Sequence, residues 1–192
     1  MPYATMQTAT LIPDLQQQVR ALLATLETEL QLLPDEALQY RPGSDKWSVL
    51  ECLEHLNRYA RYYHPALAEA LQQAAPAADA AVRFTWLGRK SCELVRPENQ
   101  KPQKTLARMN PARSHLSRSV LAELRQHQEQ LLMLLTQAVG KDLNRKVIPV
   151  EFFRLLKMCT GETLLFVVAH ARRHVQQAQR AAAQAPAVAA LS

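Results

Sequence analysis

Two histidines near the carboxyl end of the chain, His170 and His174, have the spacing of a metal-binding pair. Residues four apart on an α-helix project from the same face, one turn from each other. Two imidazoles in this arrangement can bind one divalent ion. Both are expected to point toward the protein interior, because their row borders an apolar row made of Leu164, Val168, Ala171 and Val175.

A third ligand has to come from another helix, and His55 is the candidate. It follows a strong helix start by two turns and shares its row with Tyr59 and Tyr62. Three neutral imidazoles would leave one or more coordination positions open, which is typical of catalytic rather than structural metal sites. We therefore predict a metal site made of His55, His170 and His174.

The spacing leaves other interpretations open. A histidine pair of this kind is more often semi-buried than metal-binding, and His127, which also lies near an apolar face, is the alternative third ligand. A zincin metalloprotease carries a glutamate general base directly after the first histidine of its pair, where this chain has Ala171, so that class is excluded. No general base is identified, since Glu51 caps a helix and Tyr59 is only one turn from His55.

Apolar residues recur at helical spacing in four long segments. The second begins at the capping box Ser48-Val49-Leu50-Glu51, with Trp47 placed to pack on Cys52. Pro65 falls inside this helix and is expected to kink it or end it early. Thr160 is the predicted N-cap of the last helix. The helices are predicted over residues 13–33, from 49 toward 75, over 117–139 and from 160 to 178.

A long basic segment, 76–115, separates the second and third helices and shows no sustained period. Phe84 and Trp86 could stack on nucleic-acid bases, but no nucleic-acid fold motif accompanies the charge. We favour a basic loop that is solvated or that attracts an anionic substrate, and we expect no nucleic-acid partner. The segment contains three acidic residues, Asp79, Glu93 and Glu98, and eight basic ones, so it carries +5 of the net charge of +6. The basic residues are Arg83, Arg89, Lys90, Arg96, Lys101, Lys104, Arg108 and Arg113.

These elements predict an all-α fold, an up-down four-helix bundle with a long crossover between helices two and three. No strand pattern competes, and a turn of helix is expected around 151–156. We expect a flexible arm over 1–12, a single domain over 13–180 and a flexible tail over 181–192.

The composition is that of a globular protein, with 48% hydrophobic and 21% charged residues among 192. Three widely spaced cysteines give no disulfide framework. The first residues lack the basic start and apolar stretch of a signal peptide, and no apolar run reaches the length of a membrane span. We therefore expect a cytoplasmic protein without a membrane partner.

Two segments of the chain resemble the DinB-like superfamily. Trp47–Leu56, with the sequence WSVLECLEHL, is similar to the opening of that family's second helix. Gly161–Gln177 is similar to its last helix, in which a histidine, a second histidine four residues later and a glutamine three residues beyond recur. The family order of helix, helix, long crossover, helix, helix covers nearly the whole chain.

The resemblance implies a bundle with a three-histidine metal site, whose positions match His55, His170 and His174. Ala171 departs from relatives that carry an acidic residue there, so no base is assigned at that position. Some relatives transfer low-molecular-weight thiols or isomerise thiol adducts, some are metal-dependent hydrolases, and many have no known activity.

The expected function is that of a metal-dependent enzyme, a thiol S-transferase or a hydrolase, with a small-molecule substrate such as a low-molecular-weight thiol. Zinc or nickel is the expected ion, although imidazole suits copper and iron as well. A homodimer is the expected assembly. The alternative is a non-catalytic metal-binding protein of a stress response.

Overall fold

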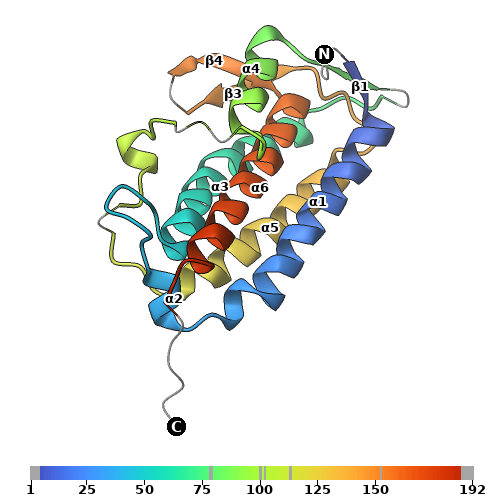
Figure 1. Ribbon diagram of the computed structural model, residues 1–192. Helices are drawn as coiled ribbons and strands as arrows, with labels where there is room; N and C mark the ends of the chain where they lie inside the picture. Colours follow the sequence, from blue (N-terminus) through green and yellow to red (C-terminus); the bar gives the residue numbers. More distant parts are fainter. Residues whose placement is uncertain are drawn as a thin grey trace.

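The computed structural model describes residues 5–77, 80–99, 101, 103–112, 114–151 and 153–186. Four long helices pack side by side (Figure 1): α1 (Thr8–Thr28), α3 (Val49–Gln72), α5 (Ser119–Gln137) and α6 (Thr160–Ala182). The largest helix interfaces are those of α3 with α6 and of α3 with α5. Shorter elements join them: the 3-10 turns η1 (Leu30–Leu32) and η2 (Ala107–Met109), and the helices α2 (Asp35–Gln39) and α4 (Trp86–Val95).

The long helices do not simply alternate in direction. One core cluster joins the start of α1 and of α6 to the end of α3 and of α5, through Leu11, Leu164, Leu67 and Leu135. A second cluster joins the opposite ends, through Leu26, Val175, Leu50 and Leu121. Therefore α1 and α6 run one way, while α3 and α5 run the other way. The long crossover makes this possible, because it returns the chain to the end of the molecule where α3 began (Figure 1).

The local signals of the second long helix are confirmed at its start. The Ser48 hydroxyl accepts from the Glu51 amide at 3.2 Å, and the Glu51 carboxylate accepts from the Ser48 amide at 2.9 Å. The helix continues past Pro65 to Gln72, so the proline does not end it early. The last helix is capped by the Cys159 sulfur rather than by Thr160, one residue earlier than predicted.

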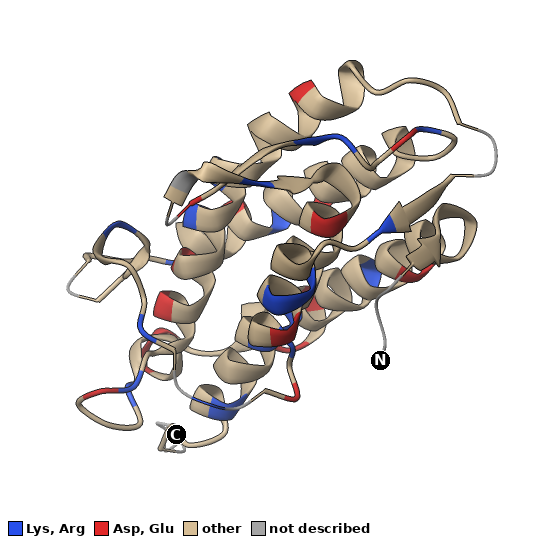
Figure 2. Cartoon of the chain, turned by 90° about the horizontal axis from the view of Figure 1, so that it is seen from above, with Lys and Arg blue, Asp and Glu red and all other residues tan. Residues whose placement is uncertain are grey.

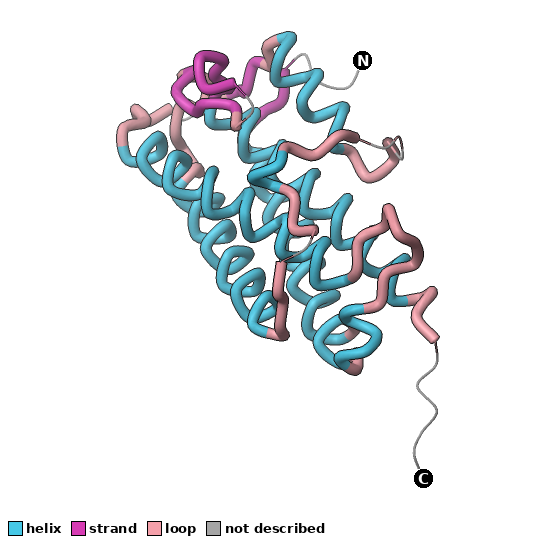
Figure 3. Tube along the Cα trace, turned by 90° about the vertical axis from the view of Figure 1, so that its left-hand side faces the viewer, coloured by secondary structure: helices cyan, strands magenta, loops and turns pink. Residues whose placement is uncertain are grey.

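The prediction of a purely helical chain is wrong, because two small antiparallel sheets lie at one end of the helices (Figure 3). Strand β1 (Thr5–Gln7) pairs with β2 (Ala81–Arg83), and β3 (Lys146–Val150) pairs with β4 (Phe153–Cys159). The second hairpin occupies the region where a helical turn was expected. Ile148 and Val150 alternate along β3 and are buried in the core, which favours a half-buried strand over a helix.

The ends of the chain also differ from the prediction. Residues 5–12, expected in a loose arm, form β1 and the first turn of α1, which begins at Thr8 rather than at Pro13. The tail was predicted from 181, whereas α6 extends to Ala182. Residues 1–4 and 187–192 lie outside the described residues.

The crossover is structured along part of its length, through β2, α4 and η2. Phe84 and Val95 are buried against the core, whereas Trp86 is 68% exposed and Leu94 is 46% exposed. The buried Glu162 carboxylate ties α4 to α6, since it accepts from the backbone amides of Thr85 and Cys159. The crossover thus packs on the long helices through α4, rather than being solvated along its whole length.

Charged residues lie on helices, strands and loops alike, with basic and acidic groups interspersed (Figure 2). Both positively and negatively charged residues thus occur within the crossover and outside it. None of the described helices is both long and apolar enough to cross a membrane.

Candidate metal centre

The structure brings His55, His170 and His174 together at the interface of α3 and α6. The Nε2 atoms of His55 and His170 lie 3.2 Å apart. The ring centroid of His174 lies 4.5 Å from that of His55 and 4.6 Å from that of His170. One ligand nitrogen from each ring lies within 4.8 Å of the others. The predicted convergence of the three rings is therefore found.

All three rings are buried, with exposed fractions of 3% for His55, 5% for His170 and 9% for His174. Burial lowers the pKa of His55 to about 4. The pKa values of His170 and His174 lie well below the ordinary value, first because of burial and then because of the neighbouring imidazoles and Arg173. Desolvation disfavours the protonated form, so the three rings are neutral at pH 7. Neutral imidazole is the form that binds metal ions.

Hydrogen bonds fix the tautomers of two of these rings. Nδ1 of His55 donates to the backbone carbonyl of Met109 at 2.7 Å, and Nδ1 of His174 donates to Oε1 of Gln177 at 3.0 Å. A neutral imidazole carries one ring proton, so Nε2 of each has a free lone pair. Because Nε2 of His55 then accepts, its 3.2 Å contact with Nε2 of His170 is a hydrogen bond donated by His170.

This donor set fits a divalent cation. Two nitrogen ligands of a tetrahedral zinc ion lie about 3.3 Å apart, for bond lengths of about 2.0–2.1 Å. The 3.2 Å between the Nε2 atoms of His55 and His170 is close to that separation. Hydrogen bonds from the far ring nitrogen to a carbonyl or amide oxygen are the usual support of metal-binding histidines, and His55 and His174 both have them.

Aromatic rings enclose the three imidazoles. Tyr59 lies 4.3 Å from His170 between ring centroids, and Phe166 is stacked on the same imidazole at 5.6 Å. Trp47 lies 4.8 Å from His55 and 5.8 Å from His174. Trp47 also packs on the core cluster that contains Cys52, the residue on which it was predicted to pack. The sequence analysis did not predict its contact with the histidines. The sequence feature that could have predicted this contact is the position of Trp47 just before the N-cap of α3, about two helical turns from His55.

Sequence reasoning also missed a buried carboxylate close to the histidines. Glu151, in the turn between β3 and β4, is 6% exposed. It accepts from the Tyr59 hydroxyl at 2.8 Å and from the Tyr63 hydroxyl at 3.1 Å. Through Tyr59, whose ring covers His170, this carboxylate is linked to the histidine cluster. Its position depends on a hairpin that the sequence pattern did not predict.

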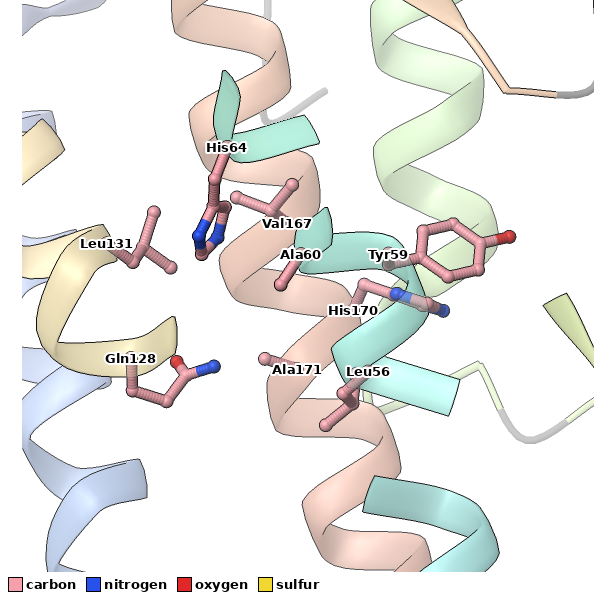
Figure 4. Close-up of a pocket in the computed structure, with 9 residues that line it drawn as sticks. All are labelled: Leu56, Tyr59, Ala60, His64, Gln128, Leu131, Val167, His170 and Ala171. Atoms are coloured by element: carbon pink, nitrogen blue, oxygen red, sulfur yellow. The ribbon is translucent and has the colours of Figure 1, made fainter. Parts of the chain in front are cut away.

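A cavity of about 20 Å³ lies between α3, α5 and α6 (Figure 4). Its lining includes His64 and Gln128, with His170 and Tyr59 extending to the opposite side of the view. The buried Oε1 of Gln128 has no hydrogen-bond partner among the described residues. The volume is large enough for one water molecule. Of the three clustered histidines, His170 lines this cavity, whereas His55 and His174 do not.

The other histidines of the chain lie elsewhere. The His64 ring is 5.5 Å from the His127 ring, and His127 faces Glu123 at 3.3 Å. His115 is exposed. Among the described residues, the one group of three or more His, Cys, Asp or Glu side chains close enough to share an ion is that of His55, His170 and His174. The alternative third ligand, His127, is therefore not part of this cluster.

The crossover lies against the histidine-bearing helix α6 and is held there by Arg173. The guanidinium donates to the backbone carbonyls of Leu94 at 3.2 Å, Arg96 at 3.3 Å and Lys101 at 2.9 Å, and also to that of Asn99. One of the basic residues next to the site thus fixes the backbone of the crossover.

A family model and a curated protein match this chain. The model of the DinB superfamily matches residues 15–178, which include all three histidines. Among curated proteins, the chain is similar to the uncharacterised protein YuaE of Bacillus subtilis (strain 168), with 29% identity over 157 residues, 80% of this chain and 90% of that protein. No solved structure matches the chain significantly.

Proposed function

Because the chain belongs to the DinB superfamily, we propose that His55, His170 and His174 bind one divalent metal ion that serves a reaction on a small molecule. The observation that carries the proposal is the cluster itself: three buried, neutral imidazoles with one ligand nitrogen each within 4.8 Å of the others. The 3.2 Å between the Nε2 atoms of His55 and His170 also supports the proposal, because it is close to the separation of two nitrogen ligands of one ion.

Zinc or nickel is the ion that we propose, since both accept imidazole ligands. Three protein ligands leave one or more positions open, where the ion would supply a Lewis acid to a substrate. Residues of the chain orient the imidazoles and keep water away from them. The Met109 carbonyl and the Gln177 amide hold the ring protons on the far nitrogens, and the rings of Trp47, Tyr59 and Phe166 shield the imidazoles from water.

Thiol transfer and hydrolysis are the two reactions that we propose. In a thiol transfer the thiol would belong to a small molecule, because the cysteines of this chain are unsuited to the role. All three are buried, and burial raises the pKa of the Cys92 and Cys159 thiols to about 12 and that of Cys52 further. A thiol with so high a pKa is not a nucleophile at pH 7. The proposed substrate is therefore a low-molecular-weight thiol or a hydrolysable small molecule.

Elemental analysis of protein purified without a histidine tag tests the metal site directly. We expect one divalent ion per chain in the wild type and loss of the ion in His55→Ala. Metal-loaded protein would then be assayed for transfer of small thiols to electrophiles and for hydrolysis of small esters and amides. Equal metal content in the wild type and in His55→Ala would refute the proposed site.

The alternative proposal is a metal-binding protein of a stress response that catalyses no reaction. Full metal occupancy without turnover in both assays would favour it. For the fold, we propose that the four long helices form the bundle of the DinB-like family. A homodimer and a cytoplasmic location complete the proposal, and light scattering of the purified protein would test the dimer.

A further inference from the structure

Arg58 makes an unusual set of contacts for a residue of a long helix. It lies on α3, three residues after His55, and its side chain is 22% exposed. One guanidinium nitrogen, Nη1, donates to the backbone carbonyls of Arg108 at 3.3 Å and Asn110 at 2.7 Å. The other, Nη2, donates to the Ser114 hydroxyl at 2.9 Å. Arg58 thus holds the crossover backbone at several points.

The two carbonyls that Arg58 binds flank Met109. The carbonyl of Met109, between them, accepts the hydrogen bond from Nδ1 of His55 at 2.7 Å. The Met109 side chain is 4% exposed, so η2 is packed against the protein. The same short stretch of backbone is therefore fixed by Arg58 and in turn fixes His55.

Glu54 sets the orientation of the guanidinium. Its Oε1 accepts from Nε of Arg58 at 2.9 Å, one helical turn away on α3. Nε, Nη1 and Nη2 are thus all engaged, and the planar group has one favourable orientation. A lysine has a single ammonium, which cannot reach Glu54, two carbonyls and a hydroxyl from fixed directions at once.

We propose that Arg58 is a positioning residue for the metal ligand His55, acting through the backbone carbonyl of Met109. The inference rests on the proposed metal site. Arg58 holds the residues on both sides of Met109, the Met109 carbonyl keeps the His55 proton on Nδ1, and Nε2 faces His170 with its lone pair. Without Arg58, this carbonyl is no longer fixed, and His55 also populates the tautomer with the proton on Nε2, which cannot bind a metal ion until it rearranges.

Arg61 provides a matched control. It lies one turn further along α3 and also binds Glu54, at 3.1 Å, but its other partner is Glu123 of α5 at 2.6 Å, not the crossover. The test compares Arg58→Met, Arg58→Lys and Arg61→Met. Far-ultraviolet circular dichroism verifies that each variant is folded, and Arg58→Lys keeps the charge if Arg58→Met is poorly folded.

The first measurement uses metal-free protein, so that it does not depend on the proposed function. Long-range ¹H–¹⁵N spectra of the imidazoles report which ring nitrogen of His55 carries the proton. We expect the Nδ1–H form in the wild type and in Arg61→Met, and a mixture of both forms in the two Arg58 variants. Hydrogen exchange of the backbone around Met109 is expected to rise in the Arg58 variants alone. An unchanged His55 tautomer in folded Arg58→Met would overturn the proposal.

The second measurement is the zinc affinity from competition with a chelator. Loss of a partner that supports a metal-binding histidine weakens metal binding by about 10–100-fold, and we expect a loss in this range for Arg58→Met and a smaller one for Arg58→Lys. Arg61→Met is expected to bind as the wild type does. A zinc affinity of Arg58→Met equal to that of the wild type would refute the proposal that Arg58 supports metal binding by His55. Failure of the wild type itself to bind zinc would instead refute the proposed function, while the tautomer measurement still decides whether Arg58 positions His55.

Discussion

Nε2 of His55 and Nε2 of His170 lie 3.2 Å apart, although 115 positions separate the two residues in the chain. Each atom is the tip of a buried ring on a different long helix. This separation is close to that of two nitrogen ligands of one zinc ion, and a ligand nitrogen of His174 lies within 4.8 Å of both. The proposed metal ion would bind among these three atoms.

Replacing any one of the three histidines by alanine is expected to remove most of the bound metal. Two imidazoles hold a divalent ion far more weakly than three, and we expect metal content to fall about tenfold or more. The helical circular dichroism signal should remain, because the two core clusters consist mainly of aliphatic side chains. His64→Ala and His115→Ala are the controls and should leave metal content unchanged.

Two adjacent tyrosines are expected to differ in how removal of their hydroxyl groups changes the free energy of unfolding. The Tyr63 hydroxyl donates to Glu151 and also accepts from its amide at 3.3 Å. The buried Tyr62 hydroxyl has no hydrogen-bond partner in the described part of the chain. Tyr63→Phe should therefore lower the free energy of unfolding by about 1.5–3 kcal/mol, since a buried carboxylate loses a donor. Tyr62→Phe should be neutral or stabilising, because it removes a desolvated hydroxyl.

Urea denaturation of both variants checks this difference. Equal losses of stability would show that the hydrogen bonds of Glu151 contribute nothing measurable, and that the effect of either change is one of packing.

Gly88→Ala is expected to destabilise the protein although alanine is the better helix former. A Cβ at position 88 would overlap the carboxylate of Glu162. That side chain is fully buried and bonded to the amides of Thr85 and Cys159, so it has no room to move away. We expect a loss of about 1–3 kcal/mol in the free energy of unfolding, as for other overpacked sites.

Gly43→Ala is the matched control for this change. Its Cβ would meet the Lys46 side chain, which is exposed and can move aside. Its effect should stay within about 0.5 kcal/mol, as for surface substitutions. A Gly88→Ala protein as stable as the wild type would mean that α4 is not anchored through Glu162.

His64 is expected to make the metal-free protein less stable at acidic pH. Burial lowers its pKa from 6.5 to about 4 in the folded state. Between these values the unfolded chain binds a proton that the folded chain does not, so stability falls as pH decreases from about 6.5 to 4. The slope from one such group is at most about 1.4 kcal/mol per pH unit.

Urea titrations of the wild type and His64→Leu between pH 7 and pH 4 isolate this contribution. The other buried histidines titrate in both proteins, so the difference between the two curves reports His64 alone. The difference in stability should change with pH by up to the slope given above. A constant difference over this range would contradict the lowered pKa.

Features that depend on neighbours along the chain follow from the amino-acid sequence alone. The four-residue spacing of His170 and His174 places both on one face of α6, and the capping box at Ser48 and Glu51 fixes where α3 begins. These relations follow from helix geometry, which repeats every 3.6 residues whatever the rest of the protein does. His55 could also be predicted as the third ligand, because it lies on a semi-buried row of its helix and because the chain resembles a known family.

The residues that lie against these helices depend on the tertiary fold. The Met109 carbonyl contacts His55 because the crossover folds back over α3, and Glu151 contacts Tyr59 because β3 and β4 form a hairpin at the end of the helices. Arg58 had no special pattern in the sequence, since its partners are backbone carbonyls, which every residue has. Helical periodicity specifies which face of a helix is buried, but the path of a long connection is set by many weak contacts among distant residues. The contacts around the three histidines therefore could not be predicted from the sequence pattern and are seen only in the folded structure.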